Sequence, residues 1–205
     1  MPPLVLGTRN RKKGEELAEL LGPWGFELVT LANLPEAIEI EETGETFAAN
    51  AALKACEQAR HLNRWALGED SGLVVDALGG EPGVYSARYS GPNATDESNN
   101  VLLLARLGKT PIERRTAHYV CHAVLSDPSG TIRAQSEGEC RGRIRLAAAG
   151  SGGFGYDPLF EIVEYHRTFG ELGPAVKACL SHRARAIRAL LPAMLRLVDL
   201  GEWRV

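Results

Sequence analysis

The start of the chain constrains the fold most, because two apolar runs flank a stretch with helical spacing. PLVLG, from Pro3 to Gly7, indicates a short buried strand. Asn10 is a good cap for a helix over Arg11–Leu21, in which leucines recur on one face. FELVTL, from Phe26 to Leu31, is typical of a second strand. A strand, a helix and a strand in this order predict an α/β fold.

The rest of the chain alternates in the same way and contains no internal repeat and no low-complexity linker. We therefore expect one domain over residues 1–205, and if it has two lobes, they interleave in sequence. The expected elements are a helix over Thr46–Leu62, a strand over Arg64–Gly68, a loop over Gly79–Ser98, a helix over Asp96–Leu107, a hairpin within Arg115–Ile144, a glycine-rich loop leading to a strand within Ala147–Val163, and a helix over Ser181–Leu200 with a kink at Pro192.

The composition argues against several kinds of binding partner. The formal net charge is -3, so the chain has no overall positive charge that would attract nucleic acid. No apolar run approaches the roughly 18 residues that a membrane span needs, and the start of the chain lacks the pattern of a signal peptide. The 4 cysteines are far apart and form no C-x-x-C pair, which argues against a zinc site. These features predict a cytoplasmic protein that meets an acidic substrate through locally placed basic side chains.

Two pairs of acidic residues are the first candidates for chemistry. Glu41 and Glu42 lie in an acidic, turn-rich segment, while Glu69 and Asp70 follow the apolar run that stops at Gly68. We expect both pairs in loops, where the second pair marks the end of a buried strand, a usual place for ligand sites in α/β folds. Carboxylates of this kind suit Mg²⁺, which takes oxygen ligands together with substrate phosphates. The alternative is that these acids are simply solvated.

Basic residues near helix starts are the second candidates. Lys13 shares a helix face with Asn10, and Lys54 shares one with Asn50. A helix N-terminus with a lysine beside it favours phosphate. For a lysine taken alone, a solvated helix surface is the better explanation.

The segment GSGGFG, Gly150–Gly155, spells the G-x-G-x-x-G pattern, but the sequence after it predicts a strand rather than a helix. A dinucleotide site needs the helix, so this interpretation is rejected. The glycines instead favour a close approach of backbone to a flat ligand, with Phe154 as a stacking surface. The alternative places Phe154 and Tyr156 in the core. Arg183 lies in the first turn of a helix, where a cation opposes the helix dipole and needs a reason to be there.

Five stretches follow one another in order along the chain, namely TRNRKKGEEL, EETGETFAANAALKA, EDSGLVVDALGGEPGVYSARYSG, GGFGYDPLF and SHRARA. Together they resemble the inosine triphosphate pyrophosphatase family, whose members hydrolyse aberrant purine nucleoside triphosphates. The resemblance spans nearly the whole chain. Glu69 departs from it, since aspartate is usual there, and Arg9 stands where glycine or asparagine is common. The acidic pair that often precedes Lys177 is missing.

The resemblance implies an elongated α/β fold, with a mixed central sheet, flanking helices and two lobes around a deep cleft. It also implies a Mg²⁺-dependent reaction that releases a nucleoside monophosphate and pyrophosphate, and a homodimer. The implied site residues are Thr8, Arg9, Asn10, Arg11, Lys12, Lys13 and Lys54 for the triphosphate, Asp70 with Glu41 or Glu42 (Glu41 being preferred) for Mg²⁺, Asp70 with Glu69 nearby for activation of water, Ser71 for a substrate contact, and Phe154, Gly155, Tyr156, Asp157, Lys177, His182 and Arg183 for the base.

The choice of base would depend on position 6 of the purine. Inosine and xanthosine carry a carbonyl there, which can accept from His182 or Arg183, whereas adenine carries an amino donor. Two alternatives remain at this point. One is a related pyrophosphatase for pyrimidine or modified nucleotides, and the other is a nucleotide-binding sensor without turnover.

Overall fold

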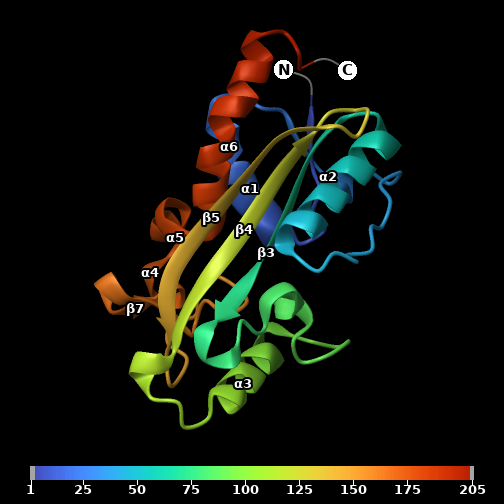
Figure 1. The fold of residues 1–205 in the computed structure, drawn as a ribbon. Helices are drawn as coiled ribbons and strands as arrows, with labels where there is room; N and C mark the ends of the chain where they lie inside the picture. The colour runs from blue at the N-terminus through green and yellow to red at the C-terminus, as the bar shows by residue number, and fades with distance from the viewer. Residues whose placement is uncertain (1–2, 204–205) are drawn as a thin grey trace. The chain divides into compact units, whose positions relative to one another are not determined.

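The computed structural model of the chain describes residues 3–203, so the outermost residues of the expected domain lie outside the described part. Figure 1 shows its strands and helices. The strands are β1 (Leu4–Leu6), β2 (Leu28–Thr30), β3 (Trp65–Val75), β4 (Thr116–Ser126), β5 (Ile132–Ile144), β6 (Phe160–Ile162) and β7 (Arg167–Thr168). The helices are α1 (Arg11–Leu21), α2 (Phe47–Leu62), α3 (Asp96–Leu107), α4 (Phe169–Leu172), α5 (Pro174–Leu180) and α6 (His182–Asp199).

The strands form one mixed sheet in the order β2-β1-β3-β4-β5-β6-β7. At one edge β1 pairs in parallel with β2 and with β3, whereas at the other edge β6 pairs antiparallel with β5 and β7. The parallel edge comes from the strand-helix-strand opening, since a crossover helix is what allows neighbouring strands to run the same way. The predicted α/β class with a mixed central sheet is confirmed, while the predicted cleft stays a prediction.

The chain divides into two compact units that interleave in sequence. The first unit consists of residues 1–70, 121–138 and 182–205, and the second of residues 71–120 and 139–181. Strands β3, β4 and β5 therefore each contribute residues to both units. Each unit has its own hydrophobic core.

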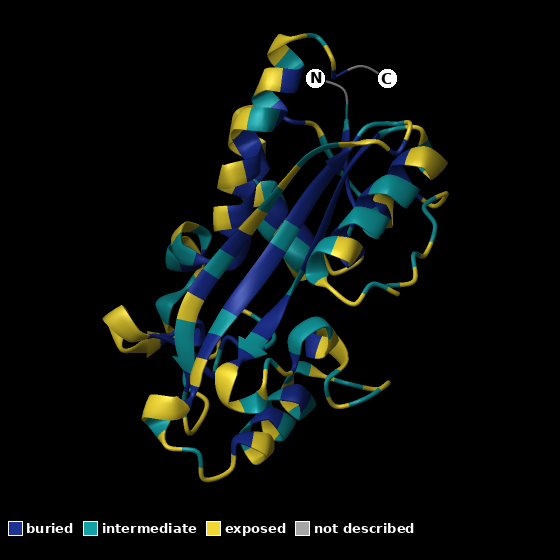
Figure 2. Cartoon of the chain, viewed as in Figure 1, coloured by how far each residue is buried: buried dark blue, intermediate teal, exposed yellow. Residues whose placement is uncertain are grey.

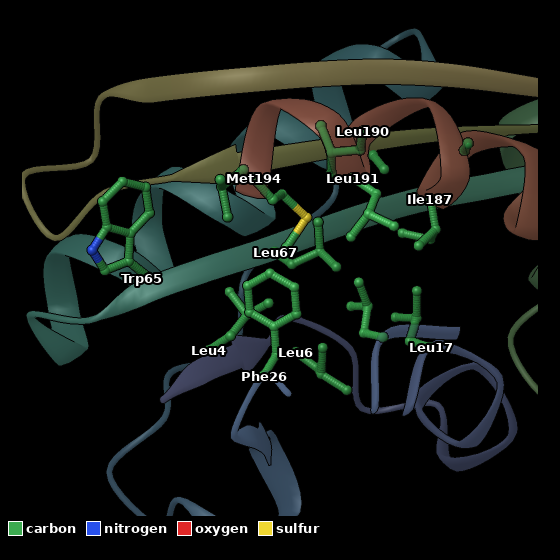
Figure 3. Packing of buried hydrophobic residues seen from close by; sticks show 14 of the residues in the cluster. Leu4, Leu6, Leu17, Phe26, Trp65, Leu67, Ile187, Leu190, Leu191 and Met194 are labelled. Carbon is green, nitrogen blue, oxygen red and sulfur yellow. The ribbon is translucent and has the colours of Figure 1, made fainter. Parts of the chain in front are cut away.

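The first unit carries helices on both faces of its strands. On one face, α1 and α6 pack Leu17 and Leu190 against Leu4, Leu6 and Leu67 (Figure 3). Successive residues of a strand point to opposite faces of the sheet. On the other face, small residues of α2 pack against the strand residues that alternate with those in the first cluster. Those contacts join Ala59 to Val5 and Ala66, and Ala51 and Ala55 to Val124.

Gly68 brings α2 close to β3. A Cβ atom at this position would lie 2.3 Å from the carbonyl oxygen of Ala51 and 2.5 Å from the backbone nitrogen of Ala55. Only glycine allows this approach, which is a matter of space because its φ is not positive. The helix is thereby seated against the strand two residues before Asp70.

The second unit is built on a different set of buried residues. Phe160 of β6 and Phe169 of α4 stack with ring centroids 5.6 Å apart, and Tyr119 of β4 lies 4.6 Å from Phe160. Leu103 and Leu107 of α3 pack into the same core. Figure 2 shows that β3 and β4 are buried along most of their length, while α3 and α6 expose one side.

The helices over Arg11–Leu21 and Asp96–Leu107 have the predicted bounds. The predicted position of Glu69 and Asp70 in a loop is wrong, because β3 continues past Gly68 to Val75. Gly79–Ser98 is less irregular than predicted and contains a 3-10 helix over Gly83–Arg88. In residues 3–203 no helix combines the length and the apolar character that crossing a membrane requires.

Candidate active site

Glu69 and Asp70 are neighbours in the middle of β3, so their side chains point to opposite faces of the strand. Both are buried, with exposed fractions of 1% and 6%. An unpaired buried carboxylate is strongly disfavoured, so each needs its own cations. Different helices supply them on the two faces.

Asp70 faces α2. Lys54 donates from Nζ to Oδ1 of Asp70 at 3.0 Å, and Asn50 donates from Nδ2 to Oδ2 at 3.2 Å. Burial raises the pKa of Asp70 above its ordinary value, and this effect outweighs the opposing charge of Lys54. Asp70 is therefore a carboxylate with a stronger tendency to take a proton than a solvated aspartate.

Glu42 shares the same lysine. Its Oε1 lies 2.9 Å from Nζ of Lys54, so one ammonium group contacts the carboxylates of Glu42 and Asp70. Burial lowers the pKa of Lys54, but Asp70, Glu69 and Glu42 together raise it above its ordinary value. Glu41, the preferred metal ligand from the sequence, is exposed at the neighbouring position.

Glu69 faces α1 and α6. Lys13 of α1 lies 2.8 Å from its Oε1, and the guanidinium of Arg183 contacts its Oε2 from Nε and Nη2 at 3.3 and 3.2 Å. Burial raises the pKa of Glu69, but Arg183 and Lys13 outweigh it and hold the pKa well below its ordinary value. Glu69 is therefore a carboxylate that favours its charged form and pairs with two cations. The thiol of Cys121 also donates to Oε2, at 3.5 Å.

Arg183 has a reason inside the protein for its place in the first turn of α6. Its Nη1 also pairs with Glu16 of α1, and its side chain is almost fully buried. The start of α6 is seated closely on β5, since a Cβ atom at Gly138 would lie 2.2 Å from the carbonyl oxygen of His182. The carboxylates of Glu16 and Glu69 are therefore a sufficient reason for a cation at this position. The predicted contact of Arg183 with a base stays a prediction.

The loop before α1 presents the helix N-terminus that the sequence predicted. Asn10 caps the helix by accepting from the backbone nitrogen of Lys13 at 3.1 Å, and Thr8 Oγ1 accepts from Asn10 at 3.2 Å. Arg9 donates to the carbonyl oxygen of Ala37, while Arg11 and Lys12 are exposed. First-turn N–H groups of such a helix attract anions.

In the second unit, Phe154 and Asp157 of the glycine-rich loop lie close to Lys177 of α5. Asp157 is buried, and its Oδ2 accepts from the backbone nitrogen of Phe154 at 2.9 Å and from Lys177 Nζ at 2.5 Å. The same Nζ lies 4.1 Å from the centroid of the half-buried Phe154 ring. Asp157 thus fixes both an aromatic face and a cation.

Gly155 and Tyr156 are held by α3 and by the core. Asp96 accepts from the backbone nitrogen of Gly155 at 2.8 Å, and Asn100 donates to its carbonyl oxygen at 2.9 Å. Tyr156 is a core residue with an exposed fraction of 3%, and its hydroxyl donates to the carbonyl oxygen of Ser86 at 2.8 Å. The loop leads into β6, so the rejection of a dinucleotide site is supported.

Asp70 and Glu42 fit a magnesium ion by their chemistry. Two carboxylates already share one cationic group, and Mg²⁺ is commonly held by one or two carboxylates together with substrate phosphates. In the described part of the chain, no group of 3 or more His, Cys, Asp or Glu side chains is arranged as a metal-binding cluster.

Residues 4–193 match the Ham1 family. The chain belongs to the Ham1 family. A relative named dITP/XTP pyrophosphatase, from Rhodopirellula baltica, is 56% identical over 196 residues, which cover 96% of this chain and 94% of the relative. A protein of the same name from Desulforamulus reducens is 46% identical, covering 95% of this chain and 96% of its own length. The resemblance drawn from the five motifs is confirmed.

Solved structures of Ham1 proteins have the same fold. A HAM1 protein from Coxiella burnetii superposes with a TM-score of 0.85 at 35% identity, covering 96% of this chain and 99% of the other. The structure described as nucleoside-triphosphatase / dITP/XTP pyrophosphatase from Mycobacterium abscessus has a TM-score of 0.74 at 45% identity, covering 93% and 99%.

Sequence reasoning selected the acids and lysines but missed several residues that hold them. Glu16, which pairs with Arg183, lies three positions after Lys13 on the same helix face, so its spacing was a usable signal. Asn50 had the corresponding spacing with Lys54, but its contact with Asp70 was not predicted. Asp96 and Asn100 had no local signal, because they hold a loop far away in sequence.

Proposed function

We propose that this chain hydrolyses non-standard purine nucleoside triphosphates, dITP and XTP among them, to the nucleoside monophosphate and pyrophosphate. The observation that carries this conclusion is the identity of 56% and 46% to relatives named dITP/XTP pyrophosphatase, over nearly the full length of both chains. Membership of the Ham1 family over residues 4–193 agrees with it.

Asp70 and Glu42 are the residues that would hold Mg²⁺. When bound, the ion would neutralise charge on the phosphates and on the leaving pyrophosphate. We prefer Glu42 to Glu41, because Glu42 already shares a cation with Asp70 while Glu41 is exposed. Lys54 lies between the two carboxylates, and its charge opposes the larger effect of burial on the pKa of Asp70.

Asp70 is also the better acceptor for the proton of the attacking water. Its pKa is raised by burial, whereas Glu69 is held charged by Arg183 and Lys13. The water oxygen forms a bond to phosphorus, the phosphoanhydride bond breaks, pyrophosphate leaves, and the water proton passes to Asp70. Glu69 contributes by fixing Lys13 rather than by taking a proton. Ser71, the next residue of β3, is kept as a predicted substrate contact.

The triphosphate would bind at the start of α1. Lys13 and Lys54 supply positive charge next to the two acids, and residues 8–12 supply backbone N–H groups and exposed side chains. A triphosphate carries several negative charges, and Lys13 and Lys54 would donate charge-assisted hydrogen bonds to it.

The base would bind at the glycine-rich loop of the second unit, where Phe154 offers an aromatic face and Lys177 a charged donor. The residues proposed here are Phe154, Gly155, Tyr156, Asp157 and Lys177. A 6-carbonyl accepts from a cation, whereas the 6-amino group of adenine would leave a buried donor unpaired, at a cost of about 1–3 kcal/mol. His182 is kept as a second donor, and the homodimer is kept as a prediction that light scattering would test.

The test is to incubate the purified chain with Mg²⁺ and a panel of nucleotides, and to quantify pyrophosphate and phosphate separately. We expect pyrophosphate from dITP, ITP and XTP, and little product from dATP or dCTP. Release of phosphate instead of pyrophosphate, or faster turnover of pyrimidine nucleotides, would overturn the proposal. A control reaction with EDTA should abolish the release.

A further inference from the structure

One face of α2 holds the acidic loop that contains Glu42. Asn50, Lys54 and Gln58 lie four residues apart and therefore on one helix face. Asn50 Oδ1 accepts from the backbone nitrogen of Gly44 at 2.8 Å, and Gln58 Nε2 donates to the carbonyl oxygen of Ile38 at 2.5 Å. Lys54 contacts Glu42 between them, at 2.9 Å. The helix thus fixes the loop at three successive points.

Asn50 is connected to the loop and to Asp70 at the same time. Its oxygen accepts from Gly44, and its nitrogen donates to Oδ2 of Asp70 at 3.2 Å. The two partners define the orientation of the amide, because a backbone N–H needs an acceptor and a carboxylate needs a donor. The side chain is fully buried, with an exposed fraction of 0%.

Gly44 shows how closely the loop is seated on this side chain. A Cβ atom at Gly44 would lie 2.6 Å from Oδ1 of Asn50 and 2.8 Å from Cβ of Ala49. The place of the loop relative to α2 is therefore set by direct contact with the amide. Because Glu42 lies two residues before Gly44, the same contact limits where its carboxylate can be.

We propose that Asn50 is a positioning residue that sets the separation of the Glu42 and Asp70 carboxylates and so prepares them to bind a divalent cation. The inference rests on the proposed metal site. The amide can do this without adding charge, whereas Lys54 competes with a cation for the same two carboxylates. Groups that orient metal ligands in this way typically change metal affinity by about 10- to 100-fold when removed.

The test measures Mn²⁺ binding by electron paramagnetic resonance, without nucleotide, in the parent chain and in Asn50→Ala. The matched control is Asn99→Ala. Asn99 is also a buried asparagine whose amide bridges backbone groups, accepting from Ser90 and donating to Ser86 and Ala87, and within residues 3–203 it forms no hydrogen bond with a carboxylate. Both variants lose a buried amide, so a merely structural effect should appear in both.

We expect Asn50→Ala to weaken the binding of Mn²⁺ by roughly 10- to 100-fold and Asn99→Ala to leave the binding unchanged. Hydrogen exchange of the Gly44 amide should accelerate in Asn50→Ala alone, and excess Mg²⁺ should restore its kcat for dITP. Gly44→Ala displaces the loop while keeping Asn50, and it should also weaken the binding of Mn²⁺. This second variant decides the question if Asn50→Ala does not fold.

An Asn50→Ala variant that binds Mn²⁺ as Asn99→Ala does would overturn the inference. Asp70→Asn separates this failure from a failure of the metal site. If Asp70→Asn loses Mn²⁺ and Asn50→Ala does not, the metal site stands and the role of Asn50 is wrong. If Asp70→Asn binds Mn²⁺ as the parent does, the metal site and the inference are both wrong.

Discussion

Glu69 and Asp70 are adjacent in β3, yet their carboxylates bind cations from different helices, Lys13 of α1 and Lys54 of α2. The alternation of a strand produces this division. One acid is held charged by Arg183 and Lys13, and the other has a raised pKa, so two neighbouring carboxylates differ in their capacity to take a proton.

Removing Arg183 tests whether it anchors Glu69 or reads the base. Arg183→Ala should lower the free energy of unfolding by roughly 3–5 kcal/mol, because it leaves buried Glu69 with less compensation. Arg106→Ala is the control, since Arg106 forms an exposed pair with Glu81, and it should cost at most about 1 kcal/mol. Urea unfolding measures both. If Arg183→Ala is as stable as the parent but loses its preference for dITP over dATP, Arg183 contacts the base instead.

Gly68→Ala should disturb the seat of α2 on β3. The added Cβ would overlap the backbone of Ala51 and Ala55, and overpacking of this kind costs about 1–3 kcal/mol. Gly22→Ala is a matched control, because nothing lies within 4 Å of a Cβ atom there. Thermal unfolding should show a lower midpoint for the first variant only. Identical midpoints would mean that α2 moves away without cost.

The fold could be predicted from the sequence because its signals are local. Asn10 and the leucines after it define α1, and the apolar runs define β1 and β2. Glu69 and Asp70 were misplaced for the opposite reason. Two adjacent acids normally end a strand, but here β3 continues through both, because Lys13 and Arg183 pair with Glu69 and Lys54 pairs with Asp70. The sequence identified the candidate acids but could not show which cation each one meets.

Lys13→Ala should weaken binding of the triphosphate far more than binding of the nucleoside. A charged hydrogen bond contributes about 1.5–3 kcal/mol, which corresponds to roughly 10- to 150-fold in the dissociation constant. Calorimetry without Mg²⁺ would compare dITP with deoxyinosine, and Lys109→Ala is the control because Lys109 is exposed. An unchanged affinity for dITP in Lys13→Ala would confine Lys13 to its pair with Glu69.

Asp127 lies in the turn between β4 and β5, and its carboxyl group should make the stability of the fold depend on pH. Burial raises its pKa, but hydrogen bonds led by that of Ser129 lower it below the ordinary value of 3.8. A depressed pKa stabilises the fold above the ordinary value, and this contribution is lost as the pH falls through the folded-state pKa. The difference in unfolding free energy between the parent and Asp127→Asn should be present at pH 7 and should shrink as the pH falls below 3.8. A difference that grows on acidification would contradict this assignment.

The most direct test of the account is the rate of pyrophosphate release from dITP by Asp70→Asn with Mg²⁺. The substitution keeps the size of the side chain but removes a proton acceptor and a metal ligand. Asp127→Asn is the control for removing a carboxylate outside the site, and circular dichroism checks the fold of both. We expect kcat to fall by at least about 100-fold in Asp70→Asn and to stay near the parent value in Asp127→Asn. A folded Asp70→Asn that turns over dITP at the parent rate, with the same Mg²⁺ dependence, would contradict it.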